Sequence, residues 1–177
     1  AKLPATTFVG FIFFILGSQW ALAQNGPNLG VLAASEEIAA WDISISPDGN
    51  GLPEGSGTAV GGKSIYMEKC LVCHGQEGSG LLNDRLAGGH GTLGGPAPIK
   101  TVGSYWPYAT TIFDYVRRAM PYLQPQTLSN EEVYALTAYL LFLNGIISED
   151  EAMDAQTLPG VKMPNRDNFI LAYLGEN

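Results

Sequence analysis

The chain has 177 residues, of which 46% are hydrophobic and 15% are charged, so its composition is that of a globular protein and not of a disordered one. Glycine is abundant, with 22 residues, which indicates long loops around a small core. The formal net charge of −8 argues against nucleic acid as a partner and favours a docking partner with a basic surface.

The first 23 residues carry the features of an export signal. Lys2 precedes an almost continuous apolar run over residues 8–16, and Ala21-Leu22-Ala23 matches an A-x-A cleavage site. The alternative is a retained membrane anchor, because residues 7–23 are just long enough to cross a bilayer. Both interpretations place the folded part outside the cytoplasm, and we expect it in the periplasm.

Residues 24–57 form a polar, turn-rich extension. Ser35 is a good N-cap for a short helix that runs to Trp41, and the glycines at 55 and 57 are typical of a hinge into the next domain. Three apolar residues indicate that part of the extension packs on the core: Trp41, Ile43 and Ile45.

Residues 58–69 are predicted to form the first core helix. Gly62, Tyr66 and Cys70 recur every four residues and therefore share one face of that helix. Residues 75–103 contain many glycines and two prolines, which predicts a long loop. A loop of this length in a small domain is expected to have a function, such as wrapping a large flat cofactor.

Two further helices are predicted after the loop. Pro107 is a favourable first residue for the earlier helix, which should end at Met120, because the residue before a proline is disfavoured in the α conformation. The later helix, residues 130–144, begins with a capping box of Ser129 and Glu132 and is apolar on most sides. No alternating strand pattern is visible, so the predicted fold class is all-α.

Residues 148–177 form a C-terminal tail that begins with an acidic run, which is usually a solvated linker. Later apolar residues indicate that the tail folds back: Leu158, Val161, Met163, Phe169 and Ile170. The predicted organisation is a signal or anchor over residues 1–23, an extension over 24–57, a core domain over 58–147 and a tail over 148–177.

The most distinctive chemistry lies in Cys70, Cys73 and His74, which form a Cys-x-x-Cys-His motif. This is the attachment pattern of a c-type haem, in which each thiol bonds one vinyl group and the histidine ligates the iron. A zinc site would need four ligands, and the remaining candidate, His90, is too far along the chain for zinc-finger spacing. A redox dithiol normally lies in a βαβ unit, which the sequence does not predict.

A haem iron held by one histidine has a second axial position, which electron carriers fill with methionine. We predict Met120, because it ends a helix and precedes a proline just before the last core helix. Met163 is the alternative, and its ordinary role would be packing in the tail. His90, in a glycine-rich loop, would give bis-histidine ligation. The sequence also leaves open whether an aromatic group packs on the haem edge or in the core: Tyr105, Trp106 and Tyr108.

The segment from Cys70 to Gly145 resembles a class I c-type cytochrome, with a CxxCH motif after a helix, a Met-Pro ligand loop and a closing helix. Several longer segments resemble the cytochrome subunit of Sox-type sulfite and sulfane dehydrogenases: 37–43, 51–58, 100–109, 118–121 and 163–165. The resemblance implies a class I cytochrome c fold and supports His74 and Met120 as the iron ligands, while the single CxxCH motif predicts a monohaem domain.

The resemblance also implies a role. Such subunits take electrons singly from a molybdenum-cofactor subunit that oxidises sulfite or protein-bound sulfane sulfur, and pass them to another carrier. Sulfane-dehydrogenase cytochromes have two haem domains, whereas this sequence has one CxxCH motif, so we expect one covalent haem c. The alternatives are a membrane-tethered carrier or a subunit of a respiratory or photosynthetic electron-transfer complex. A third, of another class, is a haem enzyme or gas sensor with His74 alone on the iron.

Overall fold

The computed structural model describes residues 29–170. They belong to two units, and the boundary along the chain lies between Trp41 and Asp42. In the first unit, helix α2 (Ser35–Trp41) has Ser35 as its first helical residue, so it begins one position earlier than the prediction of Ser35 as the N-cap implies. Trp41 is 84% exposed. The predicted signal or anchor over residues 1–23 lies outside the described residues. Within residues 29–170, no helix is long and apolar enough to cross a membrane.

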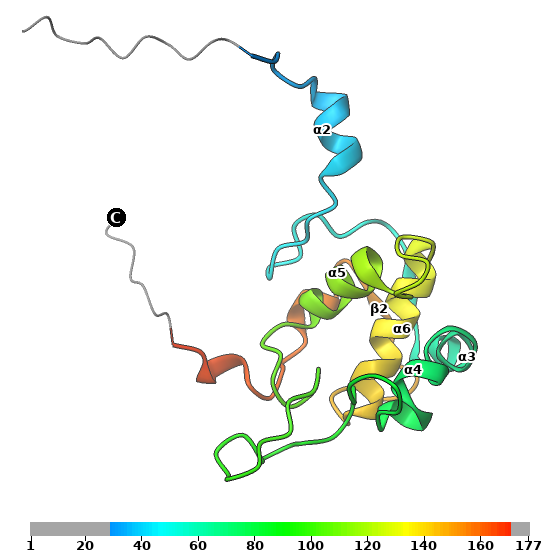
Figure 1. Ribbon diagram of the computed structural model, residues 1–177, viewed down its shortest axis with the longest axis vertical. Helices are drawn as coiled ribbons and strands as arrows, with labels where there is room; N and C mark the ends of the chain where they lie inside the picture. The colour runs from blue at the N-terminus through cyan, green and yellow to red at the C-terminus, as the bar shows by residue number, and fades with distance from the viewer. Residues whose placement is uncertain (1–28, 171–177) are drawn as a thin grey trace, which may run out of the picture. The chain divides into compact units, whose positions relative to one another are not determined.

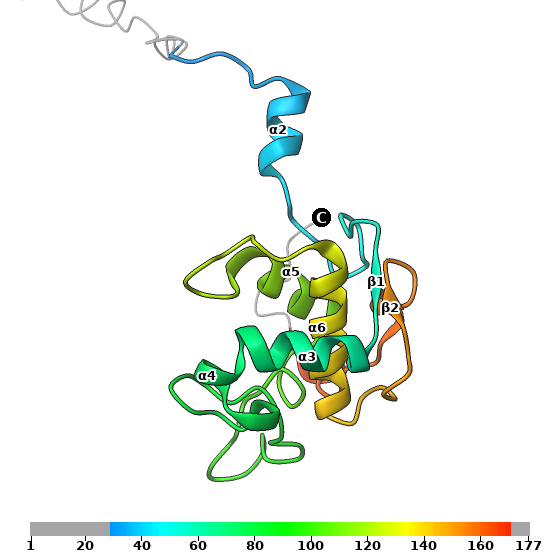
Figure 2. The same cartoon turned by 90° about the vertical axis from the view of Figure 1, so that its right-hand side faces the viewer.

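Helices α3 (Ala59–Lys69) and α6 (Asn130–Leu143) cross at the centre of the second unit, as Figures 1 and 2 show. Gly62 lies at this crossing, because a Cβ atom there would run into the backbone of Ala135. A glycine inside a helix costs about 0.5–1 kcal/mol relative to alanine. The close approach of the two helices is the physical reason why glycine is required at this point.

The start of α6 confirms the predicted capping box. The Ser129 hydroxyl accepts a hydrogen bond from the Glu132 N–H at 3.2 Å, and the Glu132 carboxylate accepts one from the Ser129 N–H at 2.8 Å. Lys69, at the end of α3, donates to the same carboxylate at 3.1 Å. The cap therefore also joins the two crossing helices.

The short helices α4 (Leu71–His74) and η1 (Gln76–Gly78, a 3-10 helix) follow α3. From there to Tyr108 the chain is an irregular loop, which agrees with the predicted loop apart from η1. Helix α5 (Ala109–Ala119) begins two residues after Pro107, the predicted first residue, because Tyr108 is still extended, with φ −137° and ψ 135°. Its end is as predicted, since Met120 is extended, with φ −121° and ψ 147°.

Two short strands were not predicted from the sequence. Strand β1 (Ser56–Gly57) pairs antiparallel with β2 (Met153–Asp154). The interpretations of the first segment as a hinge and of the second as a solvated linker are therefore wrong at these positions. Gly57 packs against the backbone of Ala135, and Met153 is fully buried. Strands of two residues are too short to show an alternating pattern.

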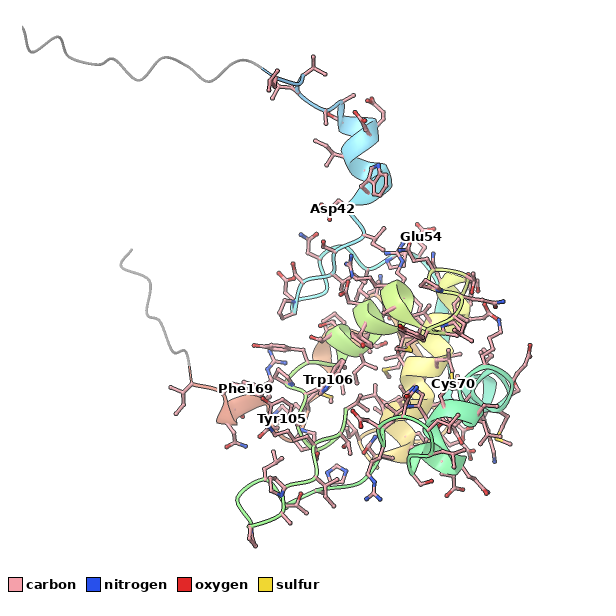
Figure 3. All side chains as sticks on the ribbon, viewed as in Figure 1. Asp42, Glu54, Cys70, Tyr105, Trp106 and Phe169 are labelled. Carbon is pink, nitrogen blue, oxygen red and sulfur yellow. The ribbon has the colours of Figure 1, made fainter. Side chains whose placement is uncertain are left out.

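The C-terminal tail folds back onto the rest of the second unit, as predicted from Leu158, Val161, Met163 and Phe169, whereas Ile170 is 92% exposed. It contains two 3-10 helices, η2 (Leu158–Gly160) and η3 (Arg166–Asn168). Phe169 lies edge-on against Tyr105, with 5.5 Å between ring centroids (Figure 3). Tail residues join side chains of α3, α5 and α6 in one hydrophobic core, whose members include Tyr66, Phe113, Tyr134, Leu136, Leu141, Leu158 and Met163.

Candidate haem site

The CxxCH motif begins at Cys70, which lies between α3 and α4, and its other four residues form α4. The Cys70 N–H donates to the Tyr66 carbonyl at 2.9 Å, which continues the hydrogen bonding of α3. The N–H groups of Cys73 and His74 both donate to the Cys70 carbonyl, at 3.1 and 3.0 Å. Both thiols are free and half-buried. The turn therefore presents two sulfur atoms and one imidazole as a single rigid group.

The loop after the motif fixes the imidazole of His74. Its Nδ1 lies 2.9 Å from the Asp84 carbonyl oxygen. A carbonyl can only accept, so Nδ1 must carry the proton and Nε2 is left with a free lone pair for a metal. The Gly80 N–H donates to the His74 carbonyl at 2.7 Å, and the Asn83 N–H donates to the Cys73 carbonyl at 2.8 Å.

Tyr66 supports the same turn from beneath. Its hydroxyl donates to the Gly75 carbonyl at 2.8 Å, and the side chain is only 1% exposed. Burial raises the pKa of Tyr66 to about 12, so the phenol remains a donor at any physiological pH. Gly75 itself has φ +75°, a conformation that favours glycine.

A cavity of about 400 Å³ opens above the motif. Its volume is within the range of cofactor sites, and its walls are mostly apolar. The walls include the following side chains from α5 and α6: Ile112, Tyr115, Val116, Leu136 and Leu140. Cys70, Cys73, His74 and Met120 all line it. Two thiols, one imidazole, one thioether and apolar walls are groups that can hold a covalent haem.

Of the four methionines, Met120 is the one that lines the cavity. Met163 is 3% exposed and packs in the core, which is the ordinary role weighed for it. Met153 is fully buried on β2, and Met67 is 47% exposed on α3. His90 is exposed and does not line the cavity.

The structure assigns different positions to the three aromatic residues Tyr105, Trp106 and Tyr108, which the sequence could not distinguish. Trp106 lines the cavity and packs edge-on against Tyr115, with 5.7 Å between ring centroids (Figure 3). Tyr105 lies under Lys100, and Tyr108 lies under Arg166, so both support loop and tail segments instead. Tyr115 also lines the cavity, and nothing in its spacing along the sequence distinguishes a cavity wall from core.

The Cys70 thiol lies in an environment that disfavours the thiolate form. Burial raises the pKa of Cys70 to about 11, and the neighbouring Cys73 adds to the effect. Zinc ligation and disulfide exchange both require the thiolate form, whereas a thioether bond to a haem vinyl group carries no charge. Among residues 29–170, no three side chains of His, Cys, Asp or Glu converge as a metal site would require.

Residues 57–140 match the protein family described as cytochrome c oxidase, cbb3-type, subunit III. The thiosulfate dehydrogenase of Allochromatium vinosum is 28% identical over 118 residues, which cover 67% of this chain and 40% of that protein. The thiosulfate dehydrogenase of Psychrobacter arcticus is 27% identical over 140 residues, which cover 76% and 42%. The chain thus spans about two fifths of the length of these curated relatives.

The crystal structure of the sulfane dehydrogenase SoxCD from Paracoccus pantotrophus contains a similar chain. The TM-score is 0.77 and the identity 44%, over 81% of this chain and 71% of that one. The likeness therefore extends to sequence as well as fold, and it confirms the predicted all-α class I cytochrome c fold with long loops. The chain belongs to the class I c-type cytochromes, the haem c proteins of electron transfer, in the family of the Sox-type sulfane dehydrogenase cytochrome subunit.

Proposed function

We propose that this protein carries single electrons through one covalent haem c. Cys70 and Cys73 would form the thioether attachments, and His74 Nε2 and the Met120 sulfur would ligate the haem iron. The observation that supports this assignment is that all four side chains line one apolar cavity. When bound, the haem supplies a one-electron iron couple. Six ligands leave no open position for a substrate, which favours electron transfer over catalysis.

Each side of the site has its own task. The Asp84 carbonyl holds His74 in the tautomer that leaves Nε2 free, and makes the imidazole a stronger ligand. The Met120 thioether is a soft ligand that favours Fe(II) and so raises the reduction potential. Apolar side chains such as Leu136 and Leu140 keep water from the iron and lower the local dielectric.

We further propose that the electron donor is the molybdenum-cofactor subunit of a periplasmic sulfite or sulfane dehydrogenase. The 44% identity to a chain of SoxCD supports this donor. The net charge of −8 favours a partner with a basic surface. Residues 1–23 direct export, residues 58–147 carry the haem, and residues 24–57 and 148–177 extend that domain.

A pair of methionine variants tests the ligand assignment. We expect Met120→Ala to abolish the methionine–iron charge-transfer band and to lower the reduction potential, because the thioether is lost. Met163→Ala is the matched control, since this methionine is buried outside the cavity and its loss should reduce stability but leave the band. The reverse pattern would show that Met163 is the ligand.

Reduction kinetics test the donor. Stopped-flow mixing with a molybdenum-containing sulfane dehydrogenase subunit and its substrate should reduce the haem, at a rate that falls steeply as salt is added. Absence of reduction, combined with co-purification of a membrane electron-transfer complex, would favour the respiratory or photosynthetic role.

A second candidate is a haem enzyme that oxidises thiosulfate itself. The names of the two curated relatives favour it. In that case thiosulfate alone would reduce the purified protein, with turnover in the presence of an artificial acceptor. The carrier proposal predicts no reduction by thiosulfate without a dehydrogenase.

A further inference from the structure

Asn144, directly after α6, makes more hydrogen bonds than a helix end requires. Its Nδ2 donates to the Leu140 carbonyl at 2.8 Å, which caps the helix in the ordinary way. The same nitrogen donates to the Leu86 carbonyl at 3.2 Å, and Oδ1 accepts from the Gly88 N–H at 3.0 Å. One side chain, 7% exposed, thus joins the central helix to a loop far away in the sequence.

The segment that Asn144 holds, residues 84–88, begins with the carbonyl that orients the proximal imidazole. Asp84, whose carbonyl accepts from His74 Nδ1 at 2.9 Å, is two residues before Leu86. The N–H groups of Leu86 and Ala87 donate to the Gly78 carbonyl, at 2.8 and 3.1 Å. Gly78 lies just after the haem motif, so those two bonds join residues 84–88 to a nearby part of the same loop and not to the central helix α6.

The Asn144 amide has little freedom to leave this position. A Cβ atom on Gly103 would collide with its amide group, so the 103 backbone closes over it from the other side. Thr101, in the same loop segment as Gly103, donates from Oγ1 to the Gly88 carbonyl at 2.8 Å. Breaking the hydrogen bonds of a buried amide with three partners is costly, because water cannot replace those partners in the interior.

We propose that Asn144 is a positioning residue for His74 and tunes the reduction potential of the haem. By holding Leu86 and Gly88 on α6, it fixes the Asp84 carbonyl against Nδ1. A firm hydrogen bond at Nδ1 makes the imidazole more basic, which stabilises the oxidised iron and lowers the potential. The inference rests on the proposed function, since it requires His74 as a ligand.

The first experiment compares holoprotein carrying Asn144→Ala with the unmodified holoprotein. We expect the reduction potential to rise on the scale of a tenfold change in the reduction equilibrium, which is about 59 mV for a one-electron couple. We also expect the His74 Nδ1 proton, followed by heteronuclear NMR of the reduced protein, to exchange faster with solvent. A folded variant with unchanged potential and unchanged exchange overturns the inference.

Two further variants separate positioning from stability. Asn144→Ser keeps a small neutral capping group but is too short to reach the loop, so its potential should rise as that of the alanine variant does. Tyr134→Phe removes a 2.8 Å bond from the same helix to the Pro53 carbonyl, outside the cavity. It should lower stability and leave the potential unchanged. A serine variant with the wild-type potential contradicts the role of Asn144.

The unmodified protein supplies a test that needs no variant. If residues 84–88 and the imidazole form one unit, the Gly88 amide and the His74 Nδ1 proton should open with the same free energy in native-state hydrogen exchange. Exchange of the Nδ1 proton while Gly88 stays protected would overturn the inference. An unmodified protein without a His/Met haem spectrum would instead overturn the proposed function.

Discussion

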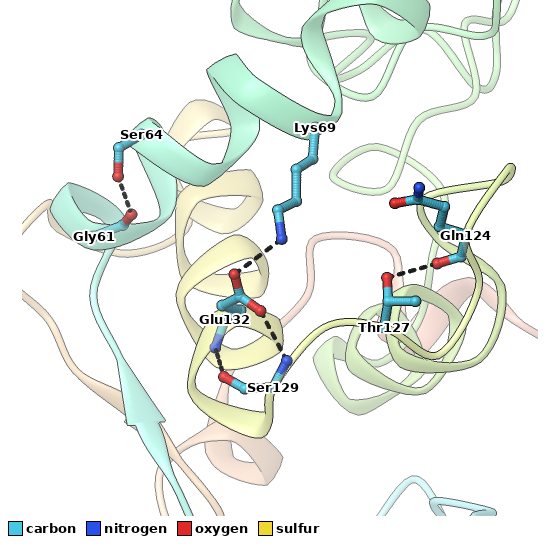
Figure 4. Close-up of polar contacts among 7 residues, drawn as sticks. All are labelled: Gly61, Ser64, Lys69, Gln124, Thr127, Ser129 and Glu132. Carbon is cyan, nitrogen blue, oxygen red and sulfur yellow. Dashed lines mark hydrogen bonds and ion pairs between the residues drawn. The ribbon is translucent and has the colours of Figure 1, made fainter.

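The two sides of the cavity are held in different ways. On the side of His74, the loop returns to the motif through the bonds of Gly80, Asn83 and Asp84, and Tyr66 binds the turn from the core. On the side of Met120, the bonds of the following segment are local, for example from the Gln124 N–H to the Pro121 carbonyl and from Thr127 to the Gln124 carbonyl (Figure 4).

Exposure does not separate the two sides. Tyr122 and Leu123, which line the cavity after Met120, are 76% and 89% exposed, and Leu81 and Leu82, on the side of His74, are 69% and 74% exposed. The difference lies in the hydrogen bonds, which return to the motif only on the side of His74. Segments with few buried contacts and exposed hydrogen bonds open at the lowest free energy. The fold thus holds His74, the proposed histidine ligand, on a frame of hydrogen bonds, whereas the segment that follows Met120, the proposed methionine ligand, has only local bonds and is expected to open more readily.

The largest effect should come from separating the two helices that carry the fixed side. Gly62→Ala places a methyl group in the backbone of Ala135, so α3 and α6 must move apart. We expect a loss of about 3 kcal/mol in the free energy of unfolding, at the upper end of overpacking effects. Urea unfolding of the holoprotein measures it.

Gly61→Ala is the matched control. The nearest atoms to a Cβ there are 3.8 and 3.9 Å away, which is ordinary van der Waals distance. Because alanine favours helix over glycine, this variant should be about 0.5–1 kcal/mol more stable. Equal destabilisation by both substitutions would show that the helix crossing is not the cause.

Native-state hydrogen exchange compares the two sides directly. We expect the Gln124 amide, on the methionine side, to open at a free energy at least about 2 kcal/mol below that of the Asn83 amide, on the histidine side. The reason is that Asn83 donates to Cys73 within the fixed turn, whereas Gln124 donates only within its own segment. Opening of both amides at the same free energy would remove the distinction.

The features that could be predicted from the sequence depend on neighbouring residues. The capping box of Ser129 and Glu132, and the end of α5 at Met120, follow from chemistry within a few positions along the chain. The features that were missed depend on distant ones. Neither the β1–β2 pairing nor the bonds from Asn144 to the loop more than 50 residues earlier leave any periodic signal. Nor does sequence distinguish Trp106, a cavity wall, from its aromatic neighbours.

A smaller effect tests one bond of the fixed side. Tyr66→Phe removes the hydroxyl that donates to the Gly75 carbonyl in the core. We expect a loss of about 1.5 kcal/mol in unfolding free energy, and faster exchange of the Asn83 amide, because the turn is released from beneath. Tyr134→Phe removes an equivalent bond to the Pro53 carbonyl and should destabilise by a similar amount without affecting Asn83. Equal changes at Asn83 in both variants would mean that Tyr66 acts only through global stability.

The smallest effect lies in the pH dependence of the cap that joins α3 to α6. The pKa of Glu132 is lowered because the Ser129 N–H donates to its carboxylate, and Lys69 adds to the effect (Figure 4). The charged form is thus favoured in the folded protein, so its contribution is complete above the ordinary pKa of 4.5 and is lost as the pH falls through the lowered value.

Glu132→Gln keeps an oxygen that can accept the Ser129 N–H but removes the charge. We expect it to cost about 0.5 kcal/mol at pH 7, the scale of a partly exposed ion pair, and nothing in acid, where the wild-type carboxyl is also neutral. Urea unfolding from pH 7 to pH 2 measures the difference. Glu131→Gln, which removes an exposed charge one residue earlier, is the control. A cost for Glu132→Gln that persists in acid would mean that the amide disturbs the cap itself, and that Lys69 contributes little to the crossing through charge.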